Sequence, residues 1–115
     1  MPKITSRAKR LRIYVGEADR CQGLPLYHAI VRKAKELDMA GATVFRGLEG
    51  YGANSRIHTA RIVDLSSDLL VLVEIVDSEE YISKLLPFLD DMVQEGMVTT
   101  EDIEVIKYGR NPPKR

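Results

Sequence analysis

A cluster of glycines with polar neighbours is the part of the sequence best suited to hold a ligand. Glycine lets backbone amides approach a bound group closely, and amides together with cationic side chains hold phosphate or carboxylate oxygens. An arginine and a histidine follow the glycines, so an anion-binding site is one interpretation of this segment. Its candidate residues are Gly47, Glu49, Gly50, Tyr51, Gly52, Arg56 and His58.

The spacing of these glycines excludes two familiar phosphate-binding motifs. Gly47, Gly50 and Gly52 do not follow the Gly-x-Gly-x-x-Gly pattern of dinucleotide-binding loops. The segment also lacks the Gly-Lys-Ser/Thr ending of a P-loop. A strand that bulges and bends at its end would explain the same residues without any ligand. Both interpretations remain open from the residues alone.

Catalytic and metal-binding constellations are weak in this chain. Cys21 is the single cysteine, and His28 and His58 are far apart, so no spacing typical of a metal site occurs. Glu49 could serve as a general base with His58 beside it, which would make the protein a small hydrolase. One carboxylate and one imidazole are little support for an enzyme. We expect a protein with no catalytic residues, no metal site and no required cofactor.

Composition and charge narrow the class of protein. The chain has 115 residues, enough for one domain, and its 17 Lys and Arg balance 17 Asp and Glu. A balanced charge gives no overall field that would attract nucleic acid. The apolar run at 69–76 contains Glu74 and is far shorter than the ~20 residues of a membrane-spanning helix. We expect a cytoplasmic protein with neither nucleic-acid binding nor membrane insertion.

Alternating apolar residues predict where the first half of the chain folds. Leu11, Ile13 and Val15 alternate with polar residues, which is typical of a strand with one buried face, and Gly16 closes it. An amphipathic helix is predicted from Pro25 to about residue 40, with Gly41 as its C-terminal cap. A second strand begins near residue 42 and runs into the glycine segment.

The second half repeats the pattern. Residues 55–65 are predicted to be either a loop or the arms of a hairpin, and 69–76 a central strand. Ser78 is the expected N-cap of a second helix, which Pro87 should kink and Gly96 should end. Residues 99–102 are predicted to form a polar turn before a last strand at 103–108.

This order predicts an α+β fold of the ferredoxin-like, split βαβ kind. Its element order is β-α-β-β-α-β, with an antiparallel sheet and both helices on one face. Because the helices shield one side and every strand carries several apolar residues, the other side is expected to be covered by further copies of the chain.

Five segments together resemble a known family. They are 11–17, 25–27, 41–47, 49–52 and 102–105, and the chain is similar through them to PII-like proteins of domain-of-unknown-function family 190. The resemblance extends from about Arg10 to Arg110, which leaves 1–9 and 111–115 as flexible tails. It implies a trimer with the ferredoxin-like fold, related to the nitrogen regulatory PII signalling proteins.

The resemblance also implies a ligand site. PII proteins bind adenine nucleotides in clefts between subunits, against a glycine-containing strand end that enters a flexible loop. Here Gly50-Tyr51-Gly52 is similar to that strand end, and residues 53–61 take the place of the loop. Thr99, in the turn 96–100, and Lys107 take the places of phosphate-side residues.

One departure from the PII pattern bears on the choice of nucleotide. Residues 99–101 replace a glycine-rich, lysine-bearing loop, and Glu101 and Asp102 are expected to repel phosphates. AMP or ADP is therefore a better expected ligand than ATP.

Together these features predict a trimeric regulatory protein in which a ligand orders residues 53–61 for docking on a partner, such as a membrane transporter or channel. A small hydrolase and a purely structural oligomer are the alternatives.

Overall fold

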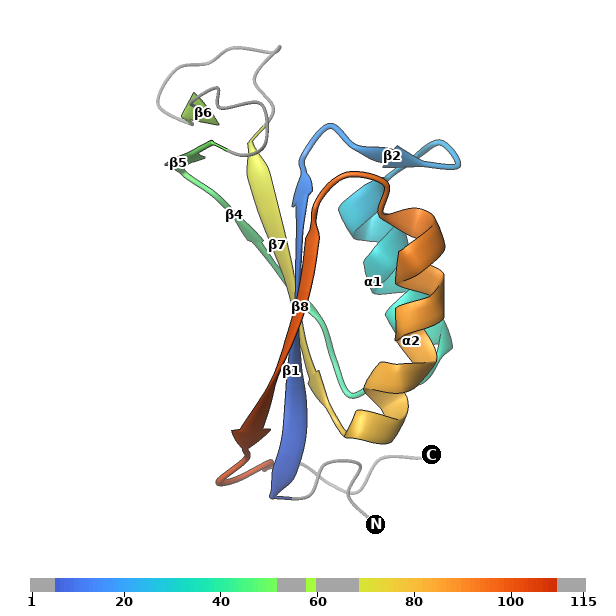
Figure 1. Cartoon of the computed structure of the whole chain (residues 1–115), viewed down its shortest axis with the longest axis vertical. Helices are drawn as coiled ribbons and strands as arrows, with labels where there is room; N and C mark the ends of the chain where they lie inside the picture. The colour runs from blue at the N-terminus through green and yellow to red at the C-terminus, as the bar shows by residue number, and fades with distance from the viewer. Residues whose placement is uncertain (1–5, 52–57, 60–68, 110–115) are drawn as a thin grey trace.

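A four-stranded sheet with two helices on one of its faces forms the body of the molecule (Figure 1). The computed structural model of the chain describes residues 6–51, 58–59 and 69–109. The strands of this sheet are β1 (Arg7–Gly16), β4 (Thr43–Arg46), β7 (Leu70–Asp77) and β8 (Met97–Glu104), and the helices are α1 (Leu26–Glu36) and α2 (Glu79–Met92). Two short ladders join β2 (Arg20–Cys21) to β3 (Leu24–Pro25), and β5 (Glu49–Gly50) to β6 (His58–Thr59).

The sheet has the strand order β4-β7-β1-β8, and every neighbouring pair is antiparallel. The two helices connect β1 to β4 and β7 to β8, so each connection crosses over a strand of the same sheet. This confirms the predicted α+β, ferredoxin-like plan.

Alternation along the two central strands produces the core. Leu11, Ile13 and Val15 of β1 are buried, and they lie opposite Ile75, Val73 and Val71 of β7. The buried side chains of α1 and α2 join the same hydrophobic cluster. Because side chains alternate between the faces of a strand, the residues between these positions lie on the face away from the helices, called here the outer face.

Helix α1 ends earlier than predicted, and Gly41 is not its cap. The helix ends at Glu36, and Asp38 has the left-handed φ of 61° that glycine more often supplies. The amide of Met39 donates to the carbonyl of Ala34 at 3.1 Å, and that of Asp38 to Lys35 at 3.0 Å. These two bonds form a Schellman motif with aspartate in the left-handed position, which aspartate tolerates better than most residues.

Helix α2 begins as predicted. The Ser78 side chain accepts a hydrogen bond from the amide of Tyr81 at 3.3 Å, which confirms the N-cap. Just before it, the fully buried Asp77 accepts from the amides of Ala40 and Ser78. This carboxylate therefore ties the loop after α1 to the start of α2. Pro87 lies inside the helix, which ends at Met92, four residues before Gly96.

The prediction for the last strand was wrong. Residues 99–102, expected to form a turn, belong to β8, which spans Met97–Glu104, while residues 105–108 follow the strand. The register explains the difference, because Glu101 and Asp102 lie opposite Arg10 and Lys9 of β1. Cross-strand pairs of opposite charge stabilise a polar strand at the edge of a sheet, and polarity alone had suggested a turn.

The start of β1 and the segment 55–65 can also be compared with the prediction. Strand β1 starts at Arg7, so residues 7–9 are part of the sheet instead of the predicted tail 1–9. Of the predicted excursion 55–65, the described part is 58–59, which pairs with Glu49 and Gly50. Those pairs agree with the hairpin alternative for this segment.

Candidate functional site

The glycine segment leaves the sheet at the end of β4. The amide of Gly47 donates to the carbonyl of Leu70 at 2.8 Å, which extends the β4 ladder by one bond. A Cβ atom at this position would lie 3.0 Å from the same carbonyl oxygen, so a side chain could enter only if the backbone shifted. Gly50 is less constrained, since a Cβ there would meet a Leu70 side-chain carbon at 3.7 Å. Close packing therefore requires glycine at 47 but not at 50.

The next residues project from the sheet. Leu48 is 79% exposed and Tyr51 is 64% exposed, and Glu49 is exposed between them. In the β5–β6 ladder Glu49 lies opposite Thr59, and Gly50 lies opposite His58. Gly52 and Arg56, two other predicted site residues, lie outside the described residues. The structure thus brings Gly47, Glu49, Gly50, Tyr51 and the backbone of His58 into one corner, called here the glycine corner. It includes β5 and β6 and follows the end of β4 (Figure 1).

An ion pair beside this corner escaped the sequence analysis. The guanidinium of Arg46 donates through Nε and Nη2 to the two carboxylate oxygens of Glu17, at 2.9 and 3.2 Å. It joins the last residue of β4 to the turn after β1. Two-point pairing fixes the direction of both side chains. Both residues lie within segments used for the family resemblance, but their separation of 29 positions gives no local pattern that would pair them.

Thr99 lies in β8, not in a loop. It is exposed and lies opposite Arg12 on the outer face, between the positions of Met97 and Glu101. Within one chain β1 and β7 separate it from β4, so the described part of the chain does not bring Thr99 to the glycine corner.

The two acidic residues expected to repel phosphates are already paired. Glu101 contacts Arg10 at 2.7 Å and Arg12 at 3.8 Å, and Asp102 contacts Lys9 at 2.7 Å. The prediction of a repulsive acidic turn is therefore wrong in its premise. The physical reason is charge neutralisation across the β1–β8 ladder.

These contacts shift two ionisation equilibria. A hydrogen bond from Lys9, followed by the attraction of its charge, lowers the pKa of Asp102 below its usual value. The same hydrogen bond raises the pKa of Lys9. The ion pair thus favours folding at pH values above the ordinary carboxyl range, and its contribution falls as acid protonates Asp102.

We predict a small, pH-dependent loss of stability for Asp102→Asn. At neutral pH the variant should unfold at lower denaturant concentration than the wild type. The difference should fade only as the pH falls below the ordinary carboxyl range and through the lowered pKa of Asp102, where the protonated carboxyl is uncharged like the amide. In a Lys9→Met background the second substitution should have no further effect. Denaturant titrations at several pH values, read by circular dichroism, measure this. A difference that persists unchanged in acid would contradict it.

Lys107 lies at the opposite end of the sheet from the glycine corner. It follows β8 at the end where Glu104 lies opposite Arg7, whereas Gly47 bonds to Leu70 at the other end. An eight-residue strand such as β8 is roughly 25 Å long. One copy of the chain therefore does not place Lys107 beside Tyr51.

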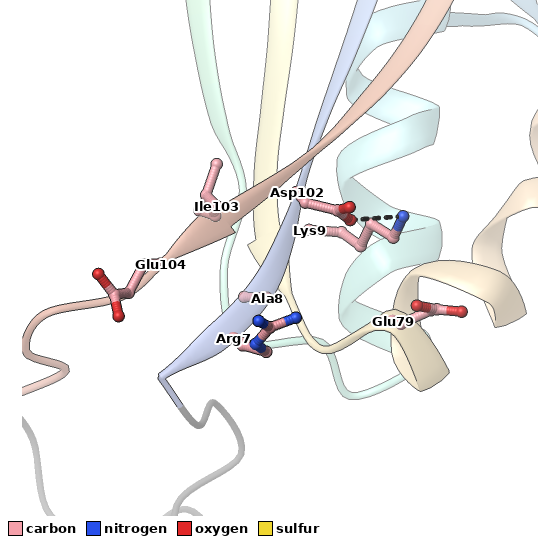
Figure 2. Close-up of a pocket in the computed structure, with 7 residues that line it drawn as sticks. All are labelled: Arg7, Ala8, Lys9, Glu79, Asp102, Ile103 and Glu104. Atoms are coloured by element: carbon pink, nitrogen blue, oxygen red, sulfur yellow. Dashed lines mark ion pairs between the residues drawn. The ribbon is translucent and has the colours of Figure 1, made fainter.

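A hollow is also present at that far end. Figure 2 shows it between the start of β1, the end of β8 and the N-terminus of α2. Its volume is about 450 Å³. The Lys9–Asp102 pair spans one side, and Glu79 approaches from α2 (Figure 2). The lining residues are Arg7, Ala8, Lys9, Glu79, Asp102, Ile103 and Glu104. None of them is a predicted site residue.

The outer face of the sheet carries a row of large apolar side chains. Phe45 lies opposite Leu72, Leu72 opposite Tyr14, and Tyr14 opposite Met97, so one residue from each strand contributes. Phe45 is 49% and Met97 53% exposed. The adjacent row holds the ion pair of Arg12 with Glu74 at 3.0 Å. The two helices lie on the other face (Figure 1), so this row faces outward in a single copy.

The described part of the chain lacks two kinds of feature. Within residues 6–51, 58–59 and 69–109, no group of three or more His, Cys, Asp or Glu could hold a metal ion. In the same ranges, no helix has the length and apolar character needed to cross a membrane.

Comparison with known sequences gives a clear match. A model of the DUF190 family, described as Uncharacterized ACR, matches residues 8–105. A UPF0166 protein of Aquifex aeolicus is 40% identical over 100 residues, which cover 87% of this chain and 94% of the relative. A UPF0166 protein of Methanocaldococcus jannaschii is 36% identical over 102 residues, with 88% and 94% covered.

Solved structures share the fold. A Thermus thermophilus protein described as a putative PII-like signalling protein has a TM-score of 0.65 and 21% identity, with 92% of this chain and 94% of that one covered. CPII of Thiomonas intermedia K12, bound to ADP and bicarbonate, has a TM-score of 0.60 and 21% identity, with 88% and 90% covered. CutA of Synechococcus elongatus PCC7942 has a TM-score of 0.55 and 12% identity, with 89% and 82% covered.

Proposed function

The chain belongs to the DUF190 family, and from this membership and its PII-like fold we propose that it is a regulatory protein that binds a small ligand between the copies of a homotrimer. The proposed ligand is an adenine nucleotide, AMP or ADP in preference to ATP. A ligand that binds where copies meet can change how the assembly contacts a partner, which is the physical basis of such regulation.

The exposed corner after β4 is the observation that carries this proposal. Gly47 packs its backbone directly on Leu70, which fixes where the chain leaves the sheet. Tyr51 directly follows the β5–β6 pair and is mostly exposed. An exposed aromatic ring can stack on a purine base, and the amides near Gly50 can donate to phosphate oxygens. Glu49 could accept a hydrogen bond from a sugar hydroxyl or an amino group.

The structural neighbours support the choice of nucleotide. CPII was crystallised with ADP and bicarbonate, and also with ADP, AMP and bicarbonate. At 20–21% identity these proteins share the fold, so the ligand is transferred to this chain as a proposal. The pairing of Glu101 and Asp102 with basic side chains of β1 removes the acidic repulsion that had favoured AMP or ADP over ATP. The proposed preference therefore rests on the ADP and AMP that CPII binds.

The outer face supports the homotrimer. The apolar row Phe45, Leu72, Tyr14 and Met97 lies on the face that no helix covers. Burying exposed apolar surface yields roughly 25 cal/mol per Å², so covering this row against other copies would stabilise an assembly. The neighbouring pairs Arg12–Glu74 and Arg10–Glu101 are internally neutralised, which lowers the cost of covering them.

The proposed output is a change in the segment after Tyr51. We propose that the bound nucleotide orders residues 53–61, of which 58–59 already pair with β5, and that this segment docks on a partner such as a membrane transporter or channel. Arg56 and His58 would then supply donors near the phosphates, and Thr99 and Lys107 would come from neighbouring copies. A cytoplasmic location agrees with this role.

A regulatory role is preferred to an enzymatic one. The neighbours described by function are a nitrogen regulatory PII-like protein and a PII-like signalling protein. Glu49 lies opposite Thr59 in the β5–β6 ladder, not opposite His58, so the ladder does not pair the acid directly with the imidazole. A hydrolase using Glu49 and His58 therefore ranks behind regulation.

Mass measurement and calorimetry test the proposal. The protein should sediment at three times its 13.0 kDa chain mass, and AMP or ADP should bind more tightly than ATP. Because stacking on one base is worth about 1–3 kcal/mol, Tyr51→Ala should weaken nucleotide binding about tenfold or more. Leu48→Ala, which alters an exposed neighbour without an aromatic ring, is the control.

The outcomes separate the parts of the proposal. A protein that sediments as a monomer would contradict the proposed ligand site between copies. A trimer that binds none of the three nucleotides would contradict the proposed ligand and would still support the proposed homotrimer. Nucleotide turnover that is lost in Glu49→Gln while binding persists would establish the enzymatic alternative.

A further inference from the structure

The basic side chain beside the glycine corner is held by a carboxylate of the same chain. Arg46 is the single Lys or Arg among residues 41–51, and Gly47 follows it directly. Its Nε and Nη2 groups donate to the two carboxylate oxygens of Glu17, at 2.9 and 3.2 Å. A guanidinium binds a carboxylate and a phosphate with the same two-point geometry. The carboxylate of Glu17 therefore occupies donors that a phosphate would use.

The guanidinium is also at the right end of the sheet. Arg46 is the last residue of β4, and Gly50 follows four residues later. Four residues span at most about 14 Å, so the chain itself keeps these two Cα atoms within that distance. The amides proposed to bind phosphate oxygens are those near Gly50. Arg46 is thus a cation within the same corner region, and the sequence analysis did not include it.

The charges around this corner oppose an anion as long as the pair is intact. Arg46 supplies one positive charge, and Glu17 and Glu49 supply two negative charges. A phosphate that approached the intact pair would meet a net negative charge, which repels it. If the Glu17 side chain moves away, the guanidinium faces the phosphate directly. A bound phosphate and the Glu17 carboxylate are therefore competitors for one cation.

The structure allows Glu17 to leave without other losses. The side chain of Arg46 is 58% exposed and that of Glu17 is 33% exposed, and ion pairs so open to water contribute little to stability. The backbone of Glu17 is held separately, because its amide donates to the carbonyl of Leu69 at 2.7 Å. The Asp19 carboxylate also accepts from the amide of Gly16 at 2.9 Å. Rotation of the Glu17 side chain into water leaves these bonds in place.

We propose that Arg46 is a phosphate-binding residue of the glycine corner and that Glu17 is its competitor within the chain, which a nucleotide phosphate displaces. A terminal phosphate carries about two negative charges at neutral pH, whereas a carboxylate carries one. Displacement also separates β4 from the turn after β1, since the ion pair joins these two elements. The inference rests on the proposed nucleotide site and assigns roles to two residues outside the predicted set.

Calorimetric titration with AMP, ADP and inorganic pyrophosphate tests the competition. Glu17→Gln should tighten the binding of ADP about threefold or more, because no carboxylate has to be displaced. Arg46→Gln should weaken it about tenfold or more, because a charge-assisted contact is lost. In the Arg46→Gln background, Glu17→Gln should have no further effect, since competition requires the guanidinium.

Two controls accompany these variants. Glu80→Gln removes an exposed acid from the first turn of α2, at the other end of the sheet, and should leave the Kd for ADP unchanged. Both members of the pair lie at the surface, so all variants should keep the circular dichroism spectrum of the wild type.

The sign of each effect decides between competition and other roles. Weaker ADP binding by Glu17→Gln would show that Glu17 positions Arg46, which overturns the proposal. Tightening of the same size in the Arg46→Gln background would indicate a general effect of charge, which also overturns it. Equal Kd values for the wild type and Glu17→Gln would overturn the competition and leave the nucleotide site standing.

Failure of the proposed ligand would give a different result. If no variant binds AMP or ADP, the nucleotide assignment is wrong. Pyrophosphate that binds Glu17→Gln more tightly than the wild type, and binds Arg46→Gln least, would then still support the competition. If no variant binds any of the three anions, both proposals are overturned.

Discussion

Replacing Gly96 with alanine is expected to lower the free energy of unfolding by about 3 kcal/mol or more. Gly96 has a φ of 142°, a conformation that residues with a Cβ atom rarely adopt. A Cβ atom there would also overlap the carbonyl oxygen of Tyr14, a backbone atom of the central strand β1. The side chains of Val93 and Val15 are within 3.3 Å of the same position, so the added methyl group cannot avoid the Tyr14 carbonyl by shifting towards them.

Gly41→Ala is the matched control. A Cβ atom at Gly41 would meet no atom within 4 Å, so the same chemical change should alter stability by less than about 0.5 kcal/mol. Denaturant unfolding followed by circular dichroism compares the two variants. Similar stabilities for Gly96→Ala and Gly41→Ala would mean that the turn into β8 can rearrange at little cost.

Leu72→Asp is expected to convert the proposed trimer into monomers. Leu72 lies in the middle of the outer-face row, between Phe45 and Tyr14. In a trimer that buries this row, each copy would carry an unpaired carboxylate into an apolar contact, which costs several kcal/mol per charge. The apparent mass should therefore fall from three times 13.0 kDa to 13.0 kDa at micromolar concentration.

Ile106→Asp controls for the added charge. Ile106 is 85% exposed and follows β8, outside the outer-face row. This variant should remain trimeric, and both variants should keep the circular dichroism spectrum of the wild type. A Leu72→Asp protein that sediments as a trimer would show that the outer face is not the contact between copies.

The parts of the fold set by neighbouring residues were predicted well. Strand periodicity located β1, and a nearly continuous apolar run located β7. The polar residue before an acidic first turn located the start of α2 at Ser78. Each of these depends on interactions within a few positions along the chain, where side-chain alternation and helix capping act.

The wrong predictions, for the end of α1 and the start of β8, concern positions that distant residues determine. Asp38, not Gly41, adopts the left-handed conformation that ends α1, because the chain must turn there towards β4 while Asp77 binds the amide of Ala40. β8 begins six residues before the predicted start, because Glu101 and Asp102 lie opposite basic residues of β1. Both outcomes depend on residues more than 30 positions away in the sequence.

For the candidate site, too, local residue patterns were predictable and long-range contacts were not. The sequence by itself determined the fold class, the family resemblance and the glycine segment, because periodicity and residue type express local chemistry. Only the tertiary structure decided that Gly47 rests on Leu70, that Arg46 pairs with Glu17, and that Thr99 and Lys107 lie away from Tyr51 in one copy. The physical reason is strand pairing, which sets the register between distant segments by cross-strand hydrogen bonds, charge pairs and the close approach of backbones.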